Sequence, residues 1–343
     1  MIFYPTLNSL KQKLNIPQNN TGKRFTNSYG MVFDNVERLH LIGTYENKAV
    51  FKSGTELTYF QYRGQNEDFG ICKANLFREN DRNKLFLQIC RTIAFENLLD
   101  KHPYIKFLKK IKINSQYIYI NHTAIAQHYE LQTPFLDLTS NFDVASFFAT
   151  CKYDTSLKSF IPYNGSSKIG VIYVYNEMMD LIRQDTNIPN FEYIGWQGLP
   201  RPEEQKASIY KLNNNDNFSN IKFVKKYYFK HSVSSSKRIW KQFDKGSILF
   251  PKDTATMLAD ECKKLKSFTK YEINNAKERF KQWIDKDTTK KEFDIFIDNL
   301  KIDYINHHKL NWGELTEYKE EYWIDKFNKV YSKSSARLCY YPK

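Results

Sequence analysis

Two short segments carry polar side chains that could do chemistry, in otherwise apolar and strand-like surroundings. Residues 60–65 read Phe-Gln-Tyr-Arg-Gly-Gln, and residues 127–140 read Gln-His-Tyr-Glu-Leu-Gln-Thr-Pro-Phe-Leu-Asp-Leu-Thr-Ser. Together they supply a guanidinium, an imidazole, a carboxylate and two hydroxyls, from Arg63, His128, Asp137, Thr139 and Ser140. Buried polar groups are costly unless they are paired. We therefore expect the two segments to build one site.

Each of these side chains also has a purely structural interpretation. Arg63 could pin the end of a strand through an ion pair with Asp137, and His128 could be a satisfied histidine of the core. Thr139 and Ser140 could cap the helix that follows them. The residue types alone leave both interpretations open.

Composition limits the class of protein. The chain has 343 residues and a net charge of +14, with 41% hydrophobic and 16% aromatic residues. The aromatic side chains can bury enough area for a sizeable core. The charge favours an acidic or polyanionic partner, but no compact basic run interleaved with glycine or aromatic residues predicts a nucleic-acid interface.

Cysteine and histidine usage predicts a metal-free protein of a reducing compartment. The cysteines are scattered and form no CxxC pair, and the adjacent His307 and His308 are not spaced to ligate a metal on a helix face. The first residues lack the pattern of a signal peptide, and no apolar run is long enough to span a bilayer. We expect a soluble, cytoplasmic protein.

The elements that must position the polar residues follow from the apolar pattern. Short strand-like runs precede Arg63, and Gly64 after it predicts a sharp turn. Helical spacing predicts helices over 82–113 and 117–131. A strand is expected at 135–139 and a helix from Asn141 or Ser140. Later strands are expected at 169–175, 207–212 and 221–229, and helices at 234–246 and 254–265.

These elements predict an α+β fold with a mixed or antiparallel β core flanked by helices. Residues 1–34 are polar and predict a loosely held leader. Residues 35–265 form the predicted core domain. Residues 266–343 are charge-rich and predict a helical C-terminal extension packed on that core, with a separate helical domain as the alternative.

The motifs resemble those of the FRG domain, a bacterial family named for its Phe/Tyr-Arg-Gly-Gln signature. The second segment resembles the family's Gln-His-Tyr-Gly-Leu-Pro-Thr-Arg-Leu-Leu-Asp-Trp-Thr block, and an Ala-x-x-Phe-Ala pattern follows at 145–149. An Arg-x-x-x-Gln element at Arg201 and Gln205 and a Leu-Phe-Pro run at 249–251 are also similar. The sequence departs from the block at Glu130, Gln132, Phe135 and Leu138. The Phe135 departure replaces an arginine and removes a possible phosphate contact.

The order of motifs is also similar, more weakly, to ADP-ribosyltransferases. That resemblance implies that NAD is the substrate, with its phosphates bound by an arginine and its ribose faced by a glutamate. The implied catalytic residues are His128, Glu204 and Gln205. The implied cofactor-binding residues are Arg63, Gln65, Tyr129, Asp137, Thr139, Ser140 and Arg201, and no metal is implied. Gln205 at the glutamate position carries no negative charge, so Glu203 or Glu204 would have to supply it.

Three functions remain open. The first is an NAD-cleaving, ADP-ribosyltransferase-like enzyme, which the resemblance places in bacterial defence or toxin action, with a protein or nucleic-acid acceptor. The second is a non-catalytic FRG module that binds a nucleotide or a partner protein. The third is a basic nucleic-acid-binding protein, which rests on the net charge alone. The sequence gives no oligomeric state.

Overall fold

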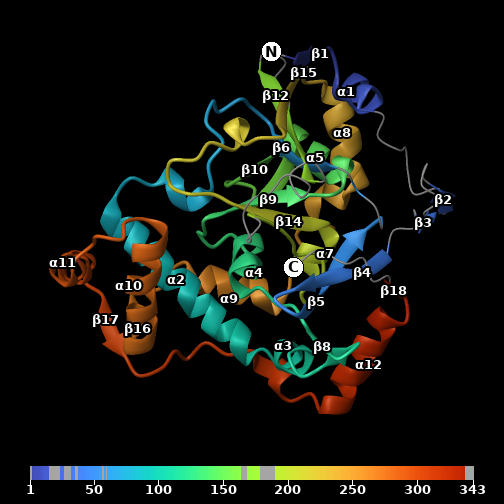
Figure 1. Ribbon diagram of the computed structural model, residues 1–343. Coiled ribbons are helices and arrows are strands. Elements are labelled where there is room, and N and C mark those ends of the chain that lie inside the picture. Colours follow the sequence, from blue (N-terminus) through green and yellow to red (C-terminus); the bar gives the residue numbers. More distant parts are fainter. Residues whose placement is uncertain are drawn as a thin grey trace.

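The computed structural model describes residues 2–14, 24–26, 32–34, 38–55, 58, 60–163, 168–177 and 190–336. Its centre is a seven-stranded sheet (Figure 1). The strand order is β1 (Ile2–Tyr4), β15 (Val224–Lys230), β12 (Ile169–Asn176), β6 (Phe60–Gln65), β9 (Phe135–Thr139), β14 (Ala207–Lys211) and β13 (Phe191–Tyr193). Neighbouring strands are antiparallel except for the parallel pair β1 and β15. The predicted α+β fold with a mixed β core is confirmed.

A second, five-stranded sheet lies beside the lower part of the first (Figure 1). Its order is β18 (Ser335–Ala336), β4 (Arg38–Tyr45), β5 (Lys48–Gly54), β8 (Gln116–Ile118) and β7 (Lys112–Ile113). Three two-stranded ribbons complete the strands described: β2 (Arg24–Thr26) with β3 (Val32–Asp34), β10 (Cys151–Asp154) with β11 (Ser159–Pro162), and β16 (Ser267–Thr269) with β17 (Asp303–Ile305).

Helices cover both faces of the large sheet, and β12 is therefore buried on both sides. Val171, Tyr173 and Tyr175 face one hydrophobic cluster, whereas Ile172 and Val174 face another. The described helices are α1 (Leu7–Lys13), α2 (Arg82–Lys101), α3 (Pro103–Leu108), α4 (His122–His128), α5 (Phe142–Thr150), α7 (Pro200–Glu204), α8 (Val233–Gln242), α9 (Thr254–Cys262), α10 (Lys270–Trp283), α11 (Lys290–Leu300) and α12 (Glu320–Tyr331). Short 3-10 turns are η1 (Asn75–Arg78), η2 (Phe218–Asn220), η3 (Asp244–Gly246) and η4 (Gly313–Thr316).

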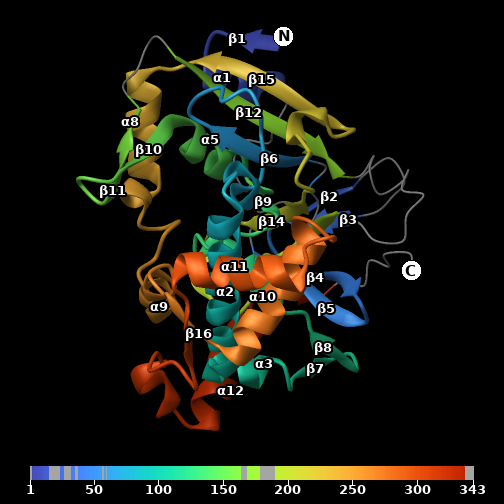
Figure 2. The ribbon, with the colours of Figure 1, turned by 90° about the vertical axis from the view of Figure 1, so that its left-hand side faces the viewer.

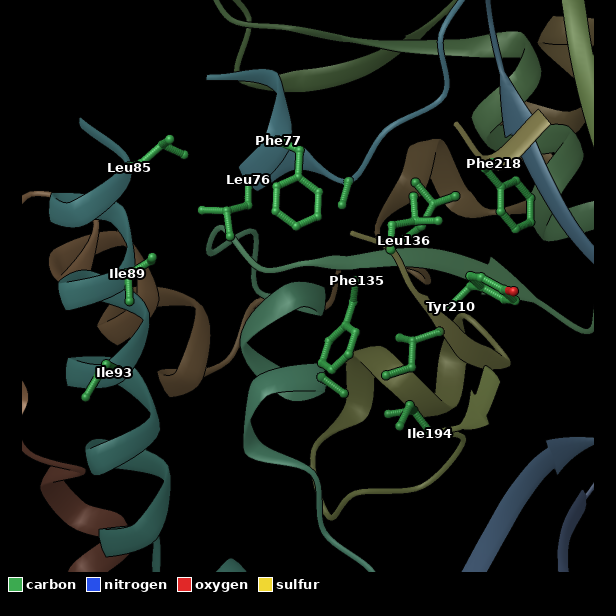
Figure 3. Packing of buried hydrophobic residues seen from close by; sticks show 14 of the residues in the cluster. Leu76, Phe77, Leu85, Ile89, Ile93, Phe135, Leu136, Ile194, Tyr210 and Phe218 are labelled. Carbon is green, nitrogen blue, oxygen red and sulfur yellow. The ribbon is translucent and has the colours of Figure 1, made fainter. Parts of the chain in front are cut away.

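The largest hydrophobic cluster lies between α2 and the large sheet. Figure 3 shows Leu85, Ile89 and Ile93 along α2, with Leu76 and Phe77 of η1 between this helix and β9. The Asp81 side chain starts α2 by accepting hydrogen bonds from the first backbone amides of the helix. This cluster fixes η1 and β9 relative to each other, and both contribute to the site described below.

The N-terminal segment is tied to the core, where a loosely held leader was expected. β1 adds an edge strand to β15, and Leu7 and Leu10 of α1 are buried in the cluster beneath α5. Lys11 forms an ion pair with Asp143 at 2.6 Å. The segment is polar overall, so its composition did not indicate that two leucines share one buried face of a helix. Residues 15–23 of the predicted leader lie outside the described residues.

The C-terminal helices pack on the core. α10 and α11 lie against α2 in both views of the chain (Figures 1 and 2), and Phe280, Phe293 and Phe296 join the same cluster as Phe86. Arg279 of α10 forms an ion pair with the buried Glu96 of α2 at 2.6 Å. These contacts make the extension part of the main core.

Two local predictions were wrong. The helix expected over 117–131 is instead the strand β8 followed by α4, which begins after its cap Asn121. The turn expected at Gly64 is absent, because Gly64 lies within β6. A side chain at Gly64 would meet the backbone of α5, since an added Cβ would lie 1.8 Å from the carbonyl oxygen of Ala145. Glycine is required there by the close approach of a helix.

Candidate functional site

The large sheet is split between its two central motif strands. β6 and β9 share one registered pair, Tyr62 with Thr139, whereas β6 pairs with β12 along its whole length and β9 does the same with β14. The facing edges of β6 and β9 beyond that pair therefore lack regular backbone partners. Arg63 and Asp137 both come from these edges.

Arg63 spans the split. Its Nη1 donates to the backbone carbonyl oxygen of Asp137 at 2.8 Å, and its Nε is buried without a hydrogen-bond partner among the described residues. Within the described chain, Arg63 forms no ion pair with a carboxylate, so the alternative interpretation of an ion pair with the Asp137 side chain is wrong. The guanidinium therefore keeps its charge uncompensated by a direct acidic partner.

A second guanidinium, which the motifs did not indicate, lies close by. Arg78 at the end of η1 donates from Nε and Nη2 to the carbonyl oxygen of Lys73. Partial desolvation lowers the pKa of Arg78, the positive charge of Arg63 lowers it further, and the charge of Asp137 raises it. Two arginines and one aspartate are thus within electrostatic reach of one another. No sequence signal marked Arg78, because it follows a loop outside both segments.

His128 is held in one orientation by the amide of Gln205. The Gln205 Nε2 donates to the carbonyl oxygen of Leu249 at 3.0 Å, which turns its Oε1 towards His128 Nδ1, also at 3.0 Å. A carbonyl oxygen can only accept, so the amide cannot be reversed without losing a hydrogen bond. His128 must therefore carry a proton on Nδ1.

The other ring nitrogen of His128 faces the Asp137 carboxylate. His128 Nε2 lies 3.9 Å from Asp137 Oδ1, a distance too long for a hydrogen bond, and both atoms are buried with no hydrogen-bond partner in the part of the chain that the structure describes. Asp137 Oδ2 accepts from Gln127 Nε2 at 3.0 Å, and Gln127 accepts in turn from Thr133. The His128 side chain is 1% exposed and that of Asp137 38%, so the pair lies at the boundary between interior and solvent.

Several buried polar atoms without a hydrogen-bond partner among the described residues lie around the split. Besides Arg63 Nε, His128 Nε2 and Asp137 Oδ1, they include Gln65 Oε1 and the Tyr173 hydroxyl, which lies on the β12 residue registered with Arg63. Buried polar atoms without partners are rare in folded proteins. Donors and acceptors are both represented, so the site is chemically suited to a ligand that has both.

Thr139 and Ser140 hold strands together. Thr139 Oγ1 donates to the carbonyl oxygen of Gln205 at 2.7 Å, and Ser140 Oγ donates to that of Lys206 at 3.4 Å. The helix α5 is capped by Asn141, one of the two residues expected there. The hydroxyls tie β9 to the start of β14, and their contact with a cofactor stays a prediction.

Tyr129 and Arg201 form a support beneath α4. The Tyr129 hydroxyl donates to Asp253 at 2.6 Å, and the Arg201 guanidinium lies 4.7 Å from the centre of the Tyr129 ring. Arg201 also donates to the carbonyl oxygen of His128 at 3.2 Å. Burial raises the pKa of Tyr129 and the charge of Asp253 raises it further, so this phenol stays neutral. These contacts fix the position of His128.

The predicted acidic pair is separate from this network. Within the described residues, no hydrogen bond or ion pair joins Glu204 to Arg63 or His128. Burial raises the pKa of Glu203. The charge of Glu203 contributes to a raised pKa of Tyr104 on α3, and Tyr104 belongs to a different hydrophobic cluster. A catalytic role for Glu204 stays a prediction. A hollow of about 110 Å³, lined by Gln88, Arg91, Glu130, Leu131, Gln132 and Lys263, contains none of the predicted site residues.

The fold and the site define an α+β domain with an arginine in a split antiparallel sheet. Residues 58–158 match the family model of the FRG domain, and the chain carries this domain. The matched span includes Arg63, Arg78, His128 and Asp137. No curated protein and no solved structure matches the chain.

The described residues also give three general findings. They include no helix with the length and apolar character to cross a membrane. They include no group of three or more acidic, histidine or cysteine side chains arranged to bind a metal. Cys72, Cys90, Cys151 and Cys262 are free and buried.

Proposed function

We propose that this FRG domain binds NAD at the split between β6 and β9 and cleaves it between nicotinamide and ribose. The observation that carries the proposal is the Arg63 guanidinium, held at the split by a carbonyl oxygen and paired with no carboxylate of the described residues. An arginine in this state is suited to bind phosphate oxygens through parallel N–H donors. Arg78 adds a second positive charge for the pyrophosphate.

For the chemical step, the protein needs to bind NAD and to supply a negative charge near the ribose. The bond between the nicotinamide nitrogen and the ribose carbon breaks, and its electron pair leaves with nicotinamide. Water or an acceptor group then adds to that carbon and loses a proton. The backbone carbonyl oxygen of Asp137 accepts from Arg63, and the Asp137 carboxylate would stabilise the positive charge that develops on the ribose.

The biological setting that we propose is a bacterial toxin or defence effector, because loss of NAD harms the cell in which it occurs. The four free, buried cysteines agree with a reducing compartment such as the cytoplasm. The acceptor, whether water, a protein or a nucleic acid, would decide between glycohydrolase and transferase activity.

The test is nicotinamide release from NAD, measured by chromatography with and without a cell extract. We expect release by the wild-type protein and a roughly 100-fold lower rate for Arg63→Ala, because the phosphates lose their main hydrogen-bond donor. Arg63→Lys keeps the charge but not the paired donors and should also be slow.

The matched control is Arg238→Ala, since Arg238 is an exposed arginine on α8 that bonds Asn8. Its rate should equal that of the wild type, and thermal melting should show that every variant is folded. Absence of release by the wild type, or release that Arg63→Ala leaves unchanged, would overturn the proposal. Binding of NAD without turnover would favour the non-catalytic module.

A further inference from the structure

The pair formed by His128 Nε2 and Asp137 Oδ1 requires hydrogen-bond donors. Because the Gln205 amide places a proton on His128 Nδ1, the neutral imidazole presents a lone pair at Nε2. Asp137 Oδ1 is also an acceptor, and the two atoms face each other at 3.9 Å. Two buried acceptors in this arrangement are stable only when a donor lies against each of them.

We propose that this pair is a subsite for the two vicinal hydroxyls of a ribose whose phosphate lies on Arg63. A vicinal diol offers two donors at a spacing that one imidazole nitrogen and one carboxylate oxygen can accept together. The backbone of Asp137 also binds Arg63, so a sugar at the carboxylate lies next to the guanidinium. The inference rests on the phosphate-binding part of the proposed function and adds the hydroxyl pattern of the ligand.

The subsite assigns different roles to three side chains. Asp137 and His128 would contact the ligand directly. Gln205 is a positioning residue, because it acts on the ligand only by fixing the His128 tautomer. The same arrangement disfavours a phosphate on either hydroxyl, since a phosphate would bring negative charge against the Asp137 carboxylate.

The first measurement is the protonation pattern of His128 by NMR with ¹⁵N-labelled histidine. We expect a protonated Nδ1 and an unprotonated Nε2 in the free protein. Gln205→Met removes the acceptor and should give a mixture of the two neutral tautomers, with the fold checked by thermal melting. A protonated Nε2 in the free wild-type protein would overturn the inference.

The second measurement is titration of the same sample with ribose 5-phosphate, 2-deoxyribose 5-phosphate and inorganic phosphate. Ribose 5-phosphate should shift the Nε2 signal, and the deoxy sugar should bind about tenfold more weakly, because it lacks one donor to a buried acceptor. Inorganic phosphate should leave the Nε2 signal unchanged. Equal binding of the two sugars, or no response to either, would contradict the subsite.

Variants separate this inference from the proposed cleavage. Asp137→Asn should remove most of the preference for ribose over deoxyribose, whereas Asp325→Asn, an exposed aspartate on α12, should keep it. A ribose preference without nicotinamide release would reject the cleavage alone. Release that depends on Arg63 but without a ribose preference would reject the subsite alone.

Discussion

At the scale of single residues, the site contains two kinds of side chain. Some bind neighbouring parts of the protein, and others keep a buried polar atom that has no hydrogen-bond partner among the described residues. Thr139 and Gln205 have hydrogen bonds to the protein through their side chains. Arg63, Arg201 and His128 each keep a buried atom without a hydrogen-bond partner among the described residues. Residue type could not distinguish these groups in the sequence, because a buried arginine or histidine serves either purpose.

A second buried polar network lies around Glu177, at the end of β12. Gln61 and the Tyr193 hydroxyl donate to its carboxylate, and Ser208 donates to Gln61 at 2.7 Å. Lys52, 2% exposed, lies nearby over the Tyr193 ring. Burial raises the pKa of Glu177 to about 7, although the charge of Lys52 and the hydrogen bonds oppose the shift.

This pKa predicts a stability that depends on pH. The folded protein binds the Glu177 proton more tightly than the unfolded chain. The resulting stabilisation of the folded state is therefore full below pH 4.5 and is lost as pH rises through about 7. The loss is on the order of 3 kcal/mol. Urea unfolding at pH 5 and pH 8 should show a smaller decrease in the free energy of unfolding for Glu177→Gln than for the wild type.

The control for that comparison is Glu321→Gln, an exposed glutamate on α12. The decrease in the free energy of unfolding of this variant between pH 5 and pH 8 should match that of the wild type. If Glu177→Gln also matches the wild type, the carboxyl of Glu177 does not titrate in this range.

At the scale of elements, the glycine of the signature motif sets the distance between β6 and α5. An added Cβ at Gly64 would lie 1.8 Å from Ala145 O and 2.7 Å from Ala149 N, both backbone atoms that cannot move alone. The small residues Ala145 and Ala149 on the facing side of α5 serve the same close contact. The Arg-Gly and Ala-x-x-Phe-Ala motifs are therefore two halves of one packing interface.

We predict that Gly64→Ala lowers the free energy of unfolding by about 3 kcal/mol or more, because helix and strand must separate. Gly70→Ala is the matched control: Gly70 has φ of +74° but no atom within 4 Å of an added Cβ. It should cost about 1 kcal/mol from backbone strain. Chemical denaturation of the two variants gives the comparison, and an equal cost would show that the α5 contact is not tight.

The sequence predicted the elements of the site better than its contacts. The strand at β9 and the helix α5 with its cap Asn141 follow from local patterns of apolar and capping residues. The role of Gly64 could not be predicted, since a glycine permits turns and close approach alike. Arg78 could not be predicted either, because only the cluster around Leu76 and Phe77 brings it to Arg63.

At the scale of the whole molecule, the core extends beyond the span that matches the FRG family. The cluster around Phe86 takes in Phe280, Phe293 and Phe296 from the C-terminal helices α10 and α11. The ribbons of these two helices lie next to α2 in Figure 2. Arg82 lies over the rings of Phe280 and Phe296 and also bonds Asp285. The matched domain alone would expose this apolar face of α2.

We therefore predict that the chain unfolds as one cooperative unit. Phe293→Ala should lower the free energy of unfolding by about 3–5 kcal/mol and shift far-ultraviolet circular dichroism and tryptophan fluorescence together. Tyr271→Ala, an exposed aromatic on α10, should change it by less than about 0.5 kcal/mol. Transitions that separate between the two probes would mean that the C-terminal helices unfold on their own.

The short strand β18 has a consequence for biosynthesis. It pairs with β4, although almost 300 residues separate the partners Ser335 and His40 along the chain. During translation the outer edge of β4 therefore keeps open backbone groups until Ser335 and Ala336 have left the ribosome. Such an edge can recruit a strand from a neighbouring nascent chain, so slow synthesis or crowded polysomes should favour aggregation through this sheet.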